Sequence, residues 1–457
     1  AAGPGYGICT GVCGDAGDCL PGAWTCSTPQ TSAPSICQCN SPQLDVCDGK
    51  DNDCNGLIDD PQPANQDCRQ RTSQPGMVCV DAGCVCPASA ITCSGFCVDP
   101  QNDVNNCGRC GHYCHNGGTG CANGACQAYP FYDAGNADIS KITTGADGFV
   151  YMGIEVVPDA GVFVEQVVRC GNGDSYCPGG PTVVTTPIAK IDDIVQDDPG
   201  ATGPLYWSTK NPSGGSGGIY GCALNAGGQC AAAPTWYSQS GSGVSEYVRF
   251  GHENAKALYF LDGQRNQIRT TDMTGPTDTN PPAFYTPAAQ HFLVVSAFAY
   301  ARPANRLFFM ETGPTSADYR LATCLTTAAC TGAAVVDIEN NLVNPGTVAV
   351  DANRVYWTDR GTGAANGRVV SCPLSGCTVA SKITYATTEV SPAEVVTDGG
   401  WVFWTANNAI RGCPVAGCPT GGPTQVWTGS ARVLAVDATT LYWVQGFGGV
   451  VMRVAKP

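Results

Sequence analysis

The chain has 457 residues and an acidic composition, with 38 Asp and Glu against 23 Lys and Arg and a net charge of −15. This charge repels nucleic acid and anionic membranes, so nucleic acid is excluded as an expected partner. The apolar run at 292–301 is far shorter than the roughly 20 residues that a membrane helix needs, and we expect no membrane span.

Cysteines divide the chain into two parts near residue 127. Nineteen of the 29 cysteines precede this point, in a segment poor in large apolar residues, and ten follow it. Such density is typical of small domains held by disulfides, which persist only in oxidising compartments. We therefore expect a secreted or cell-surface protein whose signal peptide is removed before Ala1. The sequence has no Asn-X-Ser/Thr glycosylation acceptor, which fits a bacterial origin.

Residues 1–127, here called the arm, contain a calcium-loop pattern at 47–60. With Asp51 as position one, oxygen-bearing side chains stand at the first, third, fifth and ninth positions, a glycine that permits the sharp turn stands at the sixth, and the seventh would offer its carbonyl. The twelfth is Gln62 instead of the glutamate of a full EF-hand, so Asp60 or another group would complete the shell. The expected ligands are Asp51, Asp53, Asn55, Leu57, Asp59 and Asp60. An oxygen-only set favours Ca²⁺ over copper or zinc, and no neighbour resembles a catalytic base, so we expect a structural ion.

The alternative for this loop is an acidic turn held between Cys47 and Cys54, with no metal. Together with the upstream segment from Cys19 to Cys26, the loop resembles the MopE-type metal-binding motif of secreted bacterial proteins, over about residues 19–68. This resemblance implies metal binding.

A second cluster, at 93–126, resembles the cysteine module of stigma-specific proteins, through Cys93, Cys97, Cys107, Cys110, Cys114, Cys121 and Cys126. The resemblance implies disulfides and protein contact, without catalysis. A metal cluster of Cys107, Cys110, His112 and His115 is an alternative, as is haem attachment, although Gly111 stands where the haem motif requires histidine.

The arm contains an odd number of cysteines, nineteen. If the other ten cysteines pair locally, one arm cysteine is left for an intermolecular bridge or a free thiol.

After about residue 128, an aliphatic residue followed by two large side chains recurs seven times. The copies begin at residues 150, 205, 258, 307, 355, 402 and 441, with steps of 55, 53, 49, 48, 47 and 39 residues. Strand-forming residues bounded by Gly, Pro, Asn and Asp make each unit a small antiparallel sheet, and this period predicts an all-β fold, a seven-bladed β-propeller over 128–457. Because one residue class recurs in the second strand of each unit, we expect it to pack sheet against sheet. A sugar-stacking surface is the alternative.

The fifth unit shows the expected blade most clearly, with strands at 346–351, 354–359, 368–372 and 379–385. Its Val-Tyr-Trp-Thr-Asp segment at 355–359 resembles the signature of YWTD propellers such as those of the low-density-lipoprotein receptor, and looser copies begin at Tyr206 and Phe403. We take this as a resemblance of fold.

The last unit ends soon after its third strand, at 450–454, and therefore lacks a fourth. We expect residues 128–132 to pair beside that third strand and close the ring, because closure removes the exposed edges that invite aggregation. A six-bladed ring with a spare hairpin is the alternative.

Five units carry a cysteine pair just past the aromatic motif: Cys170 and Cys177, Cys222 and Cys230, Cys324 and Cys330, Cys372 and Cys377, Cys413 and Cys418. These spacings suit a disulfide across the turn of an outer hairpin, each stabilising by about 2 kcal/mol. Zinc ribbons are the alternative, but their cysteines are closer in sequence and converge in pairs.

Catalytic signatures are sparse in this sequence. Neither a Gly-x-Ser-x-Gly elbow nor a phosphate-binding loop occurs. Acidic pairs at 192–193 and 197–198 are either part of a solvated loop or channel-facing carboxylates. We predict no catalytic residues and no cofactor besides Ca²⁺.

The predicted function is that of a non-enzymatic binding or structural protein, a propeller platform on a calcium-braced arm. The expected partners are proteins, including copies of the chain itself joined head to tail in an extracellular filament. The alternatives are a carbohydrate-binding adhesin and a propeller hydrolase or lyase that uses channel carboxylates.

Overall fold

The computed structural model describes residues 6–8, 24–26, 36–39, 44–49, 57, 59–74, 76–114, 120–156, 164–171, 177, 180–185, 190–196, 204–210, 218–239, 250–253, 257–263, 265–272, 280–446 and 448–457. The chain divides into two compact units, residues 1–127 and 128–457, which are described in turn. Within the described residues, no helix is long and apolar enough to cross a membrane.

The arm contains a small sheet, a helix and several hairpins. The sheet is antiparallel, in the order β1 (Tyr6–Ile8), β3 (Ile36–Cys39), β2 (Trp24–Cys26). The helix α1 (Pro61–Thr72) starts with a proline, whose missing NH is not needed in a first turn, and ends at Ser73 with a left-handed φ of 57°. The hairpins pair β4 (Val78–Val80) with β5 (Gly83–Val85), β6 (Ile91–Cys93) with β7 (Phe96–Val98), and β8 (Cys121–Ala122) with β9 (Ala125–Cys126).

The packing around α1 is built from disulfides instead of large apolar side chains. Cys47, Ala64 and Cys68 are buried together. Disulfides from Cys47 to Cys79 and from Cys68 to Cys84 fasten the helix and the segment before it to the β4/β5 hairpin. Because so short a segment can bury little apolar surface, covalent links supply the order that a core would otherwise give.

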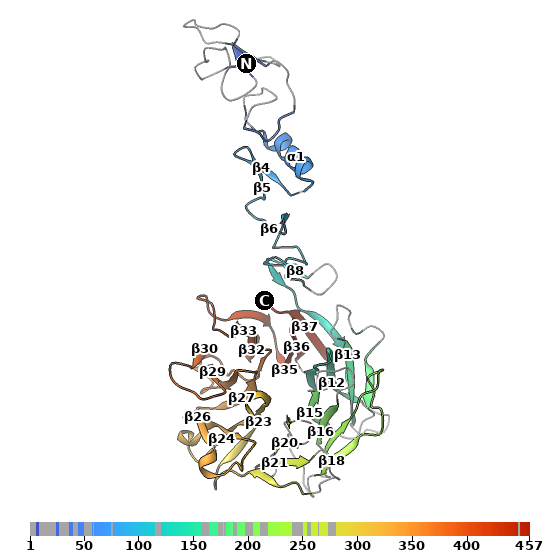
Figure 1. The fold of residues 1–457 in the computed structure, drawn as a ribbon, viewed down its shortest axis with the longest axis vertical. Coiled ribbons are helices and arrows are strands. Elements are labelled where there is room, and N and C mark those ends of the chain that lie inside the picture. The colour runs from blue at the N-terminus through green and yellow to red at the C-terminus, as the bar shows by residue number, and fades with distance from the viewer. Residues whose placement is uncertain are drawn as a thin grey trace. The chain divides into compact units, whose positions relative to one another are not determined.

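The second unit is a seven-bladed β-propeller, which confirms the predicted fold (Figure 1). Each blade is a four-stranded antiparallel sheet, and in six of the blades the first strand lines the central cavity. Blades 1 to 3 are β11 (Ile139–Thr144), β12 (Phe149–Val156), β13 (Val164–Gly171), β14 (Thr182–Thr185); β15 (Lys190–Gln196), β16 (Leu205–Lys210), β17 (Gly218–Cys222), β18 (Thr235–Gln239); and β19 (Phe250–Glu253), β20 (Ala257–Asp262), β21 (Gln267–Asp272), β22 (Ala283–Tyr285).

Blades 4 to 7 follow the same plan. Their strands are β23 (Phe292–Ala301), β24 (Arg306–Thr312), β25 (Arg320–Leu325), β26 (Val336–Asn340); β27 (Pro345–Val350), β28 (Arg354–Asp359), β29 (Gly367–Pro373), β30 (Ile383–Glu389); β31 (Val395–Thr397), β32 (Trp401–Ala406), β33 (Ala409–Pro414), β34 (Thr424–Thr428); and β35 (Ala431–Val436), β36 (Thr440–Gln445), β37 (Val450–Ala455), β10 (Tyr129–Asp133). Short 3-10 turns occur at η1 (Arg302–Ala304), η2 (Ser316–Asp318) and η3 (Gly332–Ala334).

An N-terminal strand closes the ring. β10 pairs antiparallel with β37, so that Tyr129 faces Arg453 and Asp133 faces Val450. Phe131 of β10 is fully buried, with its ring 5.2 Å from that of Tyr442 in an edge-to-face contact. The predicted closure is therefore confirmed, and the six-bladed alternative is wrong.

The recurring aromatic motif lies on the second strand of every blade and holds neighbouring blades together. Side chains alternate along a strand, so the middle residue of each copy faces the next blade and the third faces the previous one. Tyr356 of blade 5 accordingly packs in one cluster with Trp404 of blade 6, and Trp357 packs with Phe308 of blade 4. Tyr151 of blade 1 and the Trp207 side chain of blade 2 meet in the same way. These buried contacts between sheets explain why the motif recurs once per blade.

The fourth strand of blade 5 begins later than the sequence suggested, at Ile383 instead of Val379. The NH groups of Ser381 and Lys382 both donate to the carbonyl of Thr378, which forms a turn there. Val379 is 94% exposed in this turn, so its strand propensity is overridden by local hydrogen bonding.

Candidate functional site

The structure describes the two ends of the predicted calcium loop and holds them together. The Asp59 carboxylate accepts hydrogen bonds from the NH groups of Asp48 and Gly49, at 3.0 and 3.1 Å. Asp60 donates its NH to the buried carboxylate of Asp45 at 2.6 Å. Residues 47–60 therefore begin and end at one place, as a chain that wraps around an ion must.

The donor chemistry of this loop fits a hard cation. Leu57 is exposed, and Asp51, Asp53 and Asn55 lie outside the described residues. Carboxylate oxygens keep lone pairs available after accepting NH bonds, so Asp59 can serve as a ligand in its present position. Calcium binding stays a prediction. Cys47 is bonded to Cys79 and so forms no disulfide with Cys54. An acidic turn without metal stays the alternative for this loop.

Disulfides engage the cysteines of the module at 93–126. The bonds are Cys86–Cys97, Cys93–Cys110, Cys107–Cys121 and Cys114–Cys126. Each loop encloses a cysteine of the next bond, so the loops interlock along the chain. Cysteine binds metal as a thiolate, and the sulfurs of Cys107 and Cys110 are already oxidised. The metal and haem alternatives there are therefore wrong. His112 contacts the Cys107 carbonyl at 2.6 Å through Nδ1, and His115 lies outside the described residues.

The odd cysteine of the arm can be placed within a smaller set. In the part of the chain that the structure describes, eleven disulfides engage 22 of the 29 cysteines. The other seven are Cys9, Cys13, Cys19, Cys26, Cys37, Cys39 and Cys54. Seven is odd, so at least one of this set has no partner within it, and the predicted intermolecular bridge or free thiol belongs to this set.

The propeller cysteines form one bridge in each of five blades. The bonds are Cys170–Cys177, Cys222–Cys230, Cys324–Cys330, Cys372–Cys377 and Cys413–Cys418. Each starts on the third strand of its blade and fixes the connection that follows. Since all ten sulfurs are engaged, the zinc-ribbon alternative is wrong.

Three tyrosines of the repeated motif each donate a hydrogen bond to an aspartate in the turn between the first and second strands of their blade. Asp351 accepts the NH of Arg354 with one oxygen and the Tyr356 hydroxyl with the other, at 2.7 and 2.5 Å. The same arrangement joins Asp147 to Tyr151 and Asp437 to Tyr442. Burial, and then the neighbouring aspartate, raises the pKa of Tyr151, Tyr356 and Tyr442 well above the usual range. Sequence reasoning missed this role, although an aspartate stands four or five residues before each of these tyrosines.

Asp359, the last residue of the YWTD-like segment, anchors the connection that enters blade 5. It is 1% exposed, binds Arg368 at 2.7 Å, and accepts the NH groups of Val343 and Asn344. Burial alone would raise the pKa of Asp359, but Arg368 and the backbone NH groups, including that of Gly361, outweigh burial and hold the pKa below its ordinary value.

Other buried acids also pair with an arginine on the third strand of a blade. Glu311 binds Arg320 at 2.9 Å and accepts the Tyr285 hydroxyl from blade 3. Glu389, on the fourth strand of blade 5, binds Arg411 of blade 6 at 3.0 Å. These carboxylates tie adjacent blades together, a role that their sequence positions do not reveal.

Glu165 is a buried carboxylate without an arginine. Its side chain lies between blades 1 and 2, is 4% exposed, and accepts hydrogen bonds from the Ser140 hydroxyl at 2.7 Å and the Ile191 NH at 2.6 Å. Burial raises its pKa to about 7.

A Glu165→Gln variant should change how stability depends on pH. Because the folded pKa lies above the unfolded one, the native state holds more protons between about pH 4.5 and 7, and wild-type stability falls as pH rises through this window. The variant should match wild type near pH 5 and exceed it at pH 8 by up to about 3 kcal/mol. Urea denaturation at both pH values measures this. A variant that loses as much stability as wild type between them would contradict the assignment.

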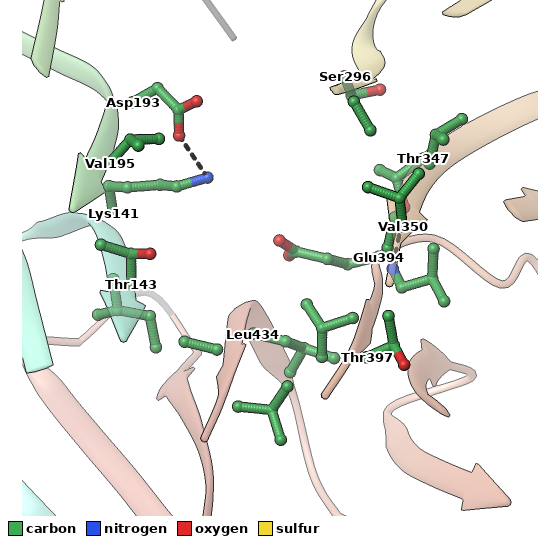
Figure 2. A pocket seen from close by; sticks show the side chains of 18 of the residues that line it. Lys141, Thr143, Asp193, Val195, Ser296, Thr347, Val350, Glu394, Thr397 and Leu434 are labelled. Atoms are coloured by element: carbon green, nitrogen blue, oxygen red, sulfur yellow. Dashed lines mark hydrogen bonds and ion pairs between the residues drawn. The ribbon is translucent and has the colours of Figure 1, made fainter. Parts of the chain in front are cut away.

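The centre of the ring holds a cavity of about 360 Å³, lined by inner strands of six blades (Figure 2). Asp193, from the acidic pair at 192–193, projects into it and forms an ion pair with Lys141 at 2.9 Å. Glu394 projects into it from the opposite wall. Asp197 and Asp198 lie outside the described residues. Of the predicted channel carboxylates, the structure thus brings Asp193 to the cavity and adds Glu394, which sequence reasoning missed.

Strand order and the central cavity define the class of protein, a seven-bladed β-propeller joined to a disulfide-rich arm. No family model and no curated protein matches the chain. Solved structures similar to it include the propeller domain of Cps50 (Swd1) from Myceliophteria thermophila, with a TM-score of 0.49, 11% identity, and coverage of 72% of this chain and 100% of that one. A catalytically inactive virginiamycin B lyase from Staphylococcus aureus has a TM-score of 0.47 and 10% identity, with coverage of 72% of this chain and 99% of that one. A prolyl endopeptidase has a TM-score of 0.46 and 13% identity over 69% of this chain, and the present chain spans 47% of its length.

Proposed function

We propose that this protein is a non-enzymatic, extracellular binding or structural protein, in which the propeller is a platform for protein contact and the arm carries Ca²⁺. The observation that supports this most is where the buried carboxylates lie. Asp193, Glu311, Asp359 and Glu389 each have a cationic partner and, apart from Asp193, stand between blades or connections. A catalytic acid or base needs a tuned pKa beside a substrate cavity. Glu165, which has such a pKa, does not line the cavity.

Disulfide chemistry supports the extracellular location. In each of five blades a disulfide starts on the third strand. In the arm the disulfides interlock along 86–126. Such bonds are reduced in the cytosol. The fold therefore depends on an oxidising environment, and we propose that the protein reaches this environment by export.

Protein contact is supported by apolar side chains that the arm does not cover. Leu44, Leu57 and Phe96 are 77%, 61% and 59% exposed. Large apolar side chains exposed in this way are available for contact with another protein. We propose that the partner is a second copy of the chain and that head-to-tail contacts of this kind build an open filament.

Nothing in the described part of the propeller favours the adhesin alternative. The exposed large apolar side chains there are Val183, Phe292, Leu325, Val336, Val343 and Val379, with no tryptophan or tyrosine among them. Trp357, Trp404 and Trp443 of the motif are fully buried. Sugar binding by stacking needs an aromatic face open to solvent.

Assembly should depend on calcium. Light scattering after size-exclusion chromatography, with negative-stain images, should show filaments in Ca²⁺ and smaller particles after chelation. Asp53→Asn should shift assembly to higher Ca²⁺, since it removes one charged ligand of the loop. Asp81→Asn is the matched control, because it removes the same charge from the arm at a positive φ that asparagine tolerates. Monomers under every condition would reject the filament, and filaments indifferent to chelation would reject the calcium requirement.

A further inference from the structure

The central cavity is a built chamber whose wall is fixed by bonds between blades. Thr144 donates its hydroxyl to the carbonyl of Val436 at 2.8 Å, joining blade 1 to blade 7. Ser296 donates to Gly346 at 3.1 Å, joining blade 4 to blade 5, and Thr347 donates to Ala393 at 2.9 Å, at the entry to blade 6. These hydroxyls are engaged in holding the wall, so the chamber keeps its form without a ligand.

Charges in the chamber do not balance. Lys141 and Asp193 neutralise each other on one side. Glu394 projects from the other side (Figure 2), and its carboxylate has no bonding partner among the described residues, although its backbone NH donates to Thr405. The described lining therefore carries one uncompensated negative charge. A carboxylate in a narrow chamber loses part of its hydration, and a cation that reaches it restores the lost interaction.

Apolar surface surrounds this carboxylate. Val195, Val350 and Leu434 line the same chamber (Figure 2), and its volume of about 360 Å³ lies within the range of small-molecule sites. A ligand suited to it combines a compact cationic head for Glu394 with a short hydrocarbon chain.

A divalent metal fits this chamber less well. Ca²⁺ and Mg²⁺ require six or more oxygen ligands. Here the Asp193 carboxylate is held by Lys141 and the hydroxyls of Ser296 and Thr347 donate to carbonyls, which leaves Glu394 as the single carboxylate available. One carboxylate is sufficient for an ammonium group, which needs a few acceptors and no fixed coordination shell.

We propose that the central cavity binds a primary alkylammonium group, with the Glu394 carboxylate accepting its protons and the apolar wall covering its alkyl chain. The ammonium group belongs to a small free amine or to a lysine side chain of a peptide. This site is independent of calcium and of self-assembly, so it stands whether or not the chain forms filaments.

Calorimetric titration of the full chain in Hepes buffer, in which CaCl₂ stays soluble, tests the site. n-Butylamine and Nα-acetyl-lysine amide are the probes, and n-butanol is the uncharged control. We expect saturable binding of one equivalent of amine and none of the alcohol. Glu394→Gln should weaken amine binding by about tenfold to a hundredfold, because a charge-assisted hydrogen bond is lost. Glu339→Gln is the matched control, since it removes the same charge from the outermost strand of blade 4, and it should bind as wild type does.

The two probes separate the sources of the ligand. Tighter binding of Nα-acetyl-lysine amide indicates a peptide side chain, and tighter binding of n-butylamine indicates a free amine. Absence of saturable binding by either amine at concentrations on the order of 10 mM would overturn the proposal, as would equal binding by Glu394→Gln and wild type. Binding of CaCl₂ that Glu394→Gln abolishes, with no amine binding, would assign the chamber to a metal instead.

Discussion

Replacing Phe131 by alanine should lower the free energy of unfolding of the propeller by about 3–5 kcal/mol, the usual cost of removing a fully buried aromatic side chain. Phe131 is 0% exposed and packs against Tyr442 and Arg453 in the blade that closes the ring. Loosening β10 would also leave the edge of β37 open to pairing with another chain, so we expect the variant to aggregate on heating. Urea denaturation followed by tryptophan fluorescence measures the first effect, and light scattering measures the second.

Pro130→Ala is the control for ring closure. Pro130 is the neighbouring residue of β10, but its side chain is exposed, so the change should stay within about 0.5 kcal/mol. If Phe131→Ala were as harmless as the control, β10 would not be needed to close the ring.

Replacing Asp359 by alanine should cost about 3–5 kcal/mol, because it removes the nearer of the two acidic partners of Arg368 and the acceptor of the NH groups of Val343 and Asn344. The pKa of Asp359 is lowered in the folded state, so its contribution is complete above the unfolded pKa and is lost as pH falls through the folded pKa. The difference between wild type and variant should therefore shrink below about pH 4. Denaturation at pH 7 and pH 3 checks both statements.

Asp337→Ala provides the comparison for an exposed ion pair. Asp337 binds Arg320 at 2.8 Å with its side chain 39% exposed, and such pairs contribute less than about 1 kcal/mol. A loss at Asp359 no larger than the loss at Asp337 would show that the YWTD-like aspartate is not an anchor.

Several features of the fold were predictable because they depend on neighbours in sequence. The seven aromatic copies mark the second strand of each blade, and the expected third strand of blade 5 at 368–372 lies within β29. Cysteines five to eight residues apart, such as Cys372 and Cys377, meet across a single turn. Where a local hydrogen bond competed with strand propensity, at Thr378, the expected boundary was wrong.

Candidate sites were predictable only where the residues that form them are close together in the chain. The calcium loop occupies 14 consecutive residues, and the structure describes its ends in contact through Asp59. The chamber at Glu394 gave no such signal, because its walls come from strands as far apart in the chain as Lys141 and Val436. Neither the ion pair of Lys141 with Asp193 nor the solitary carboxylate opposite it has a pattern in sequence.

The sequence by itself determined the number of blades, the closing strand, the five propeller disulfides and the division near residue 127, since each follows from periodicity, spacing or composition along the chain. The tertiary structure alone decided which arm cysteines pair, which arginine on one blade meets an acid on another, and which carboxylates reach the centre of the ring. The physical reason is that these depend on contacts between residues far apart in the chain, and only closure of the ring and of the disulfide loops brings those residues together.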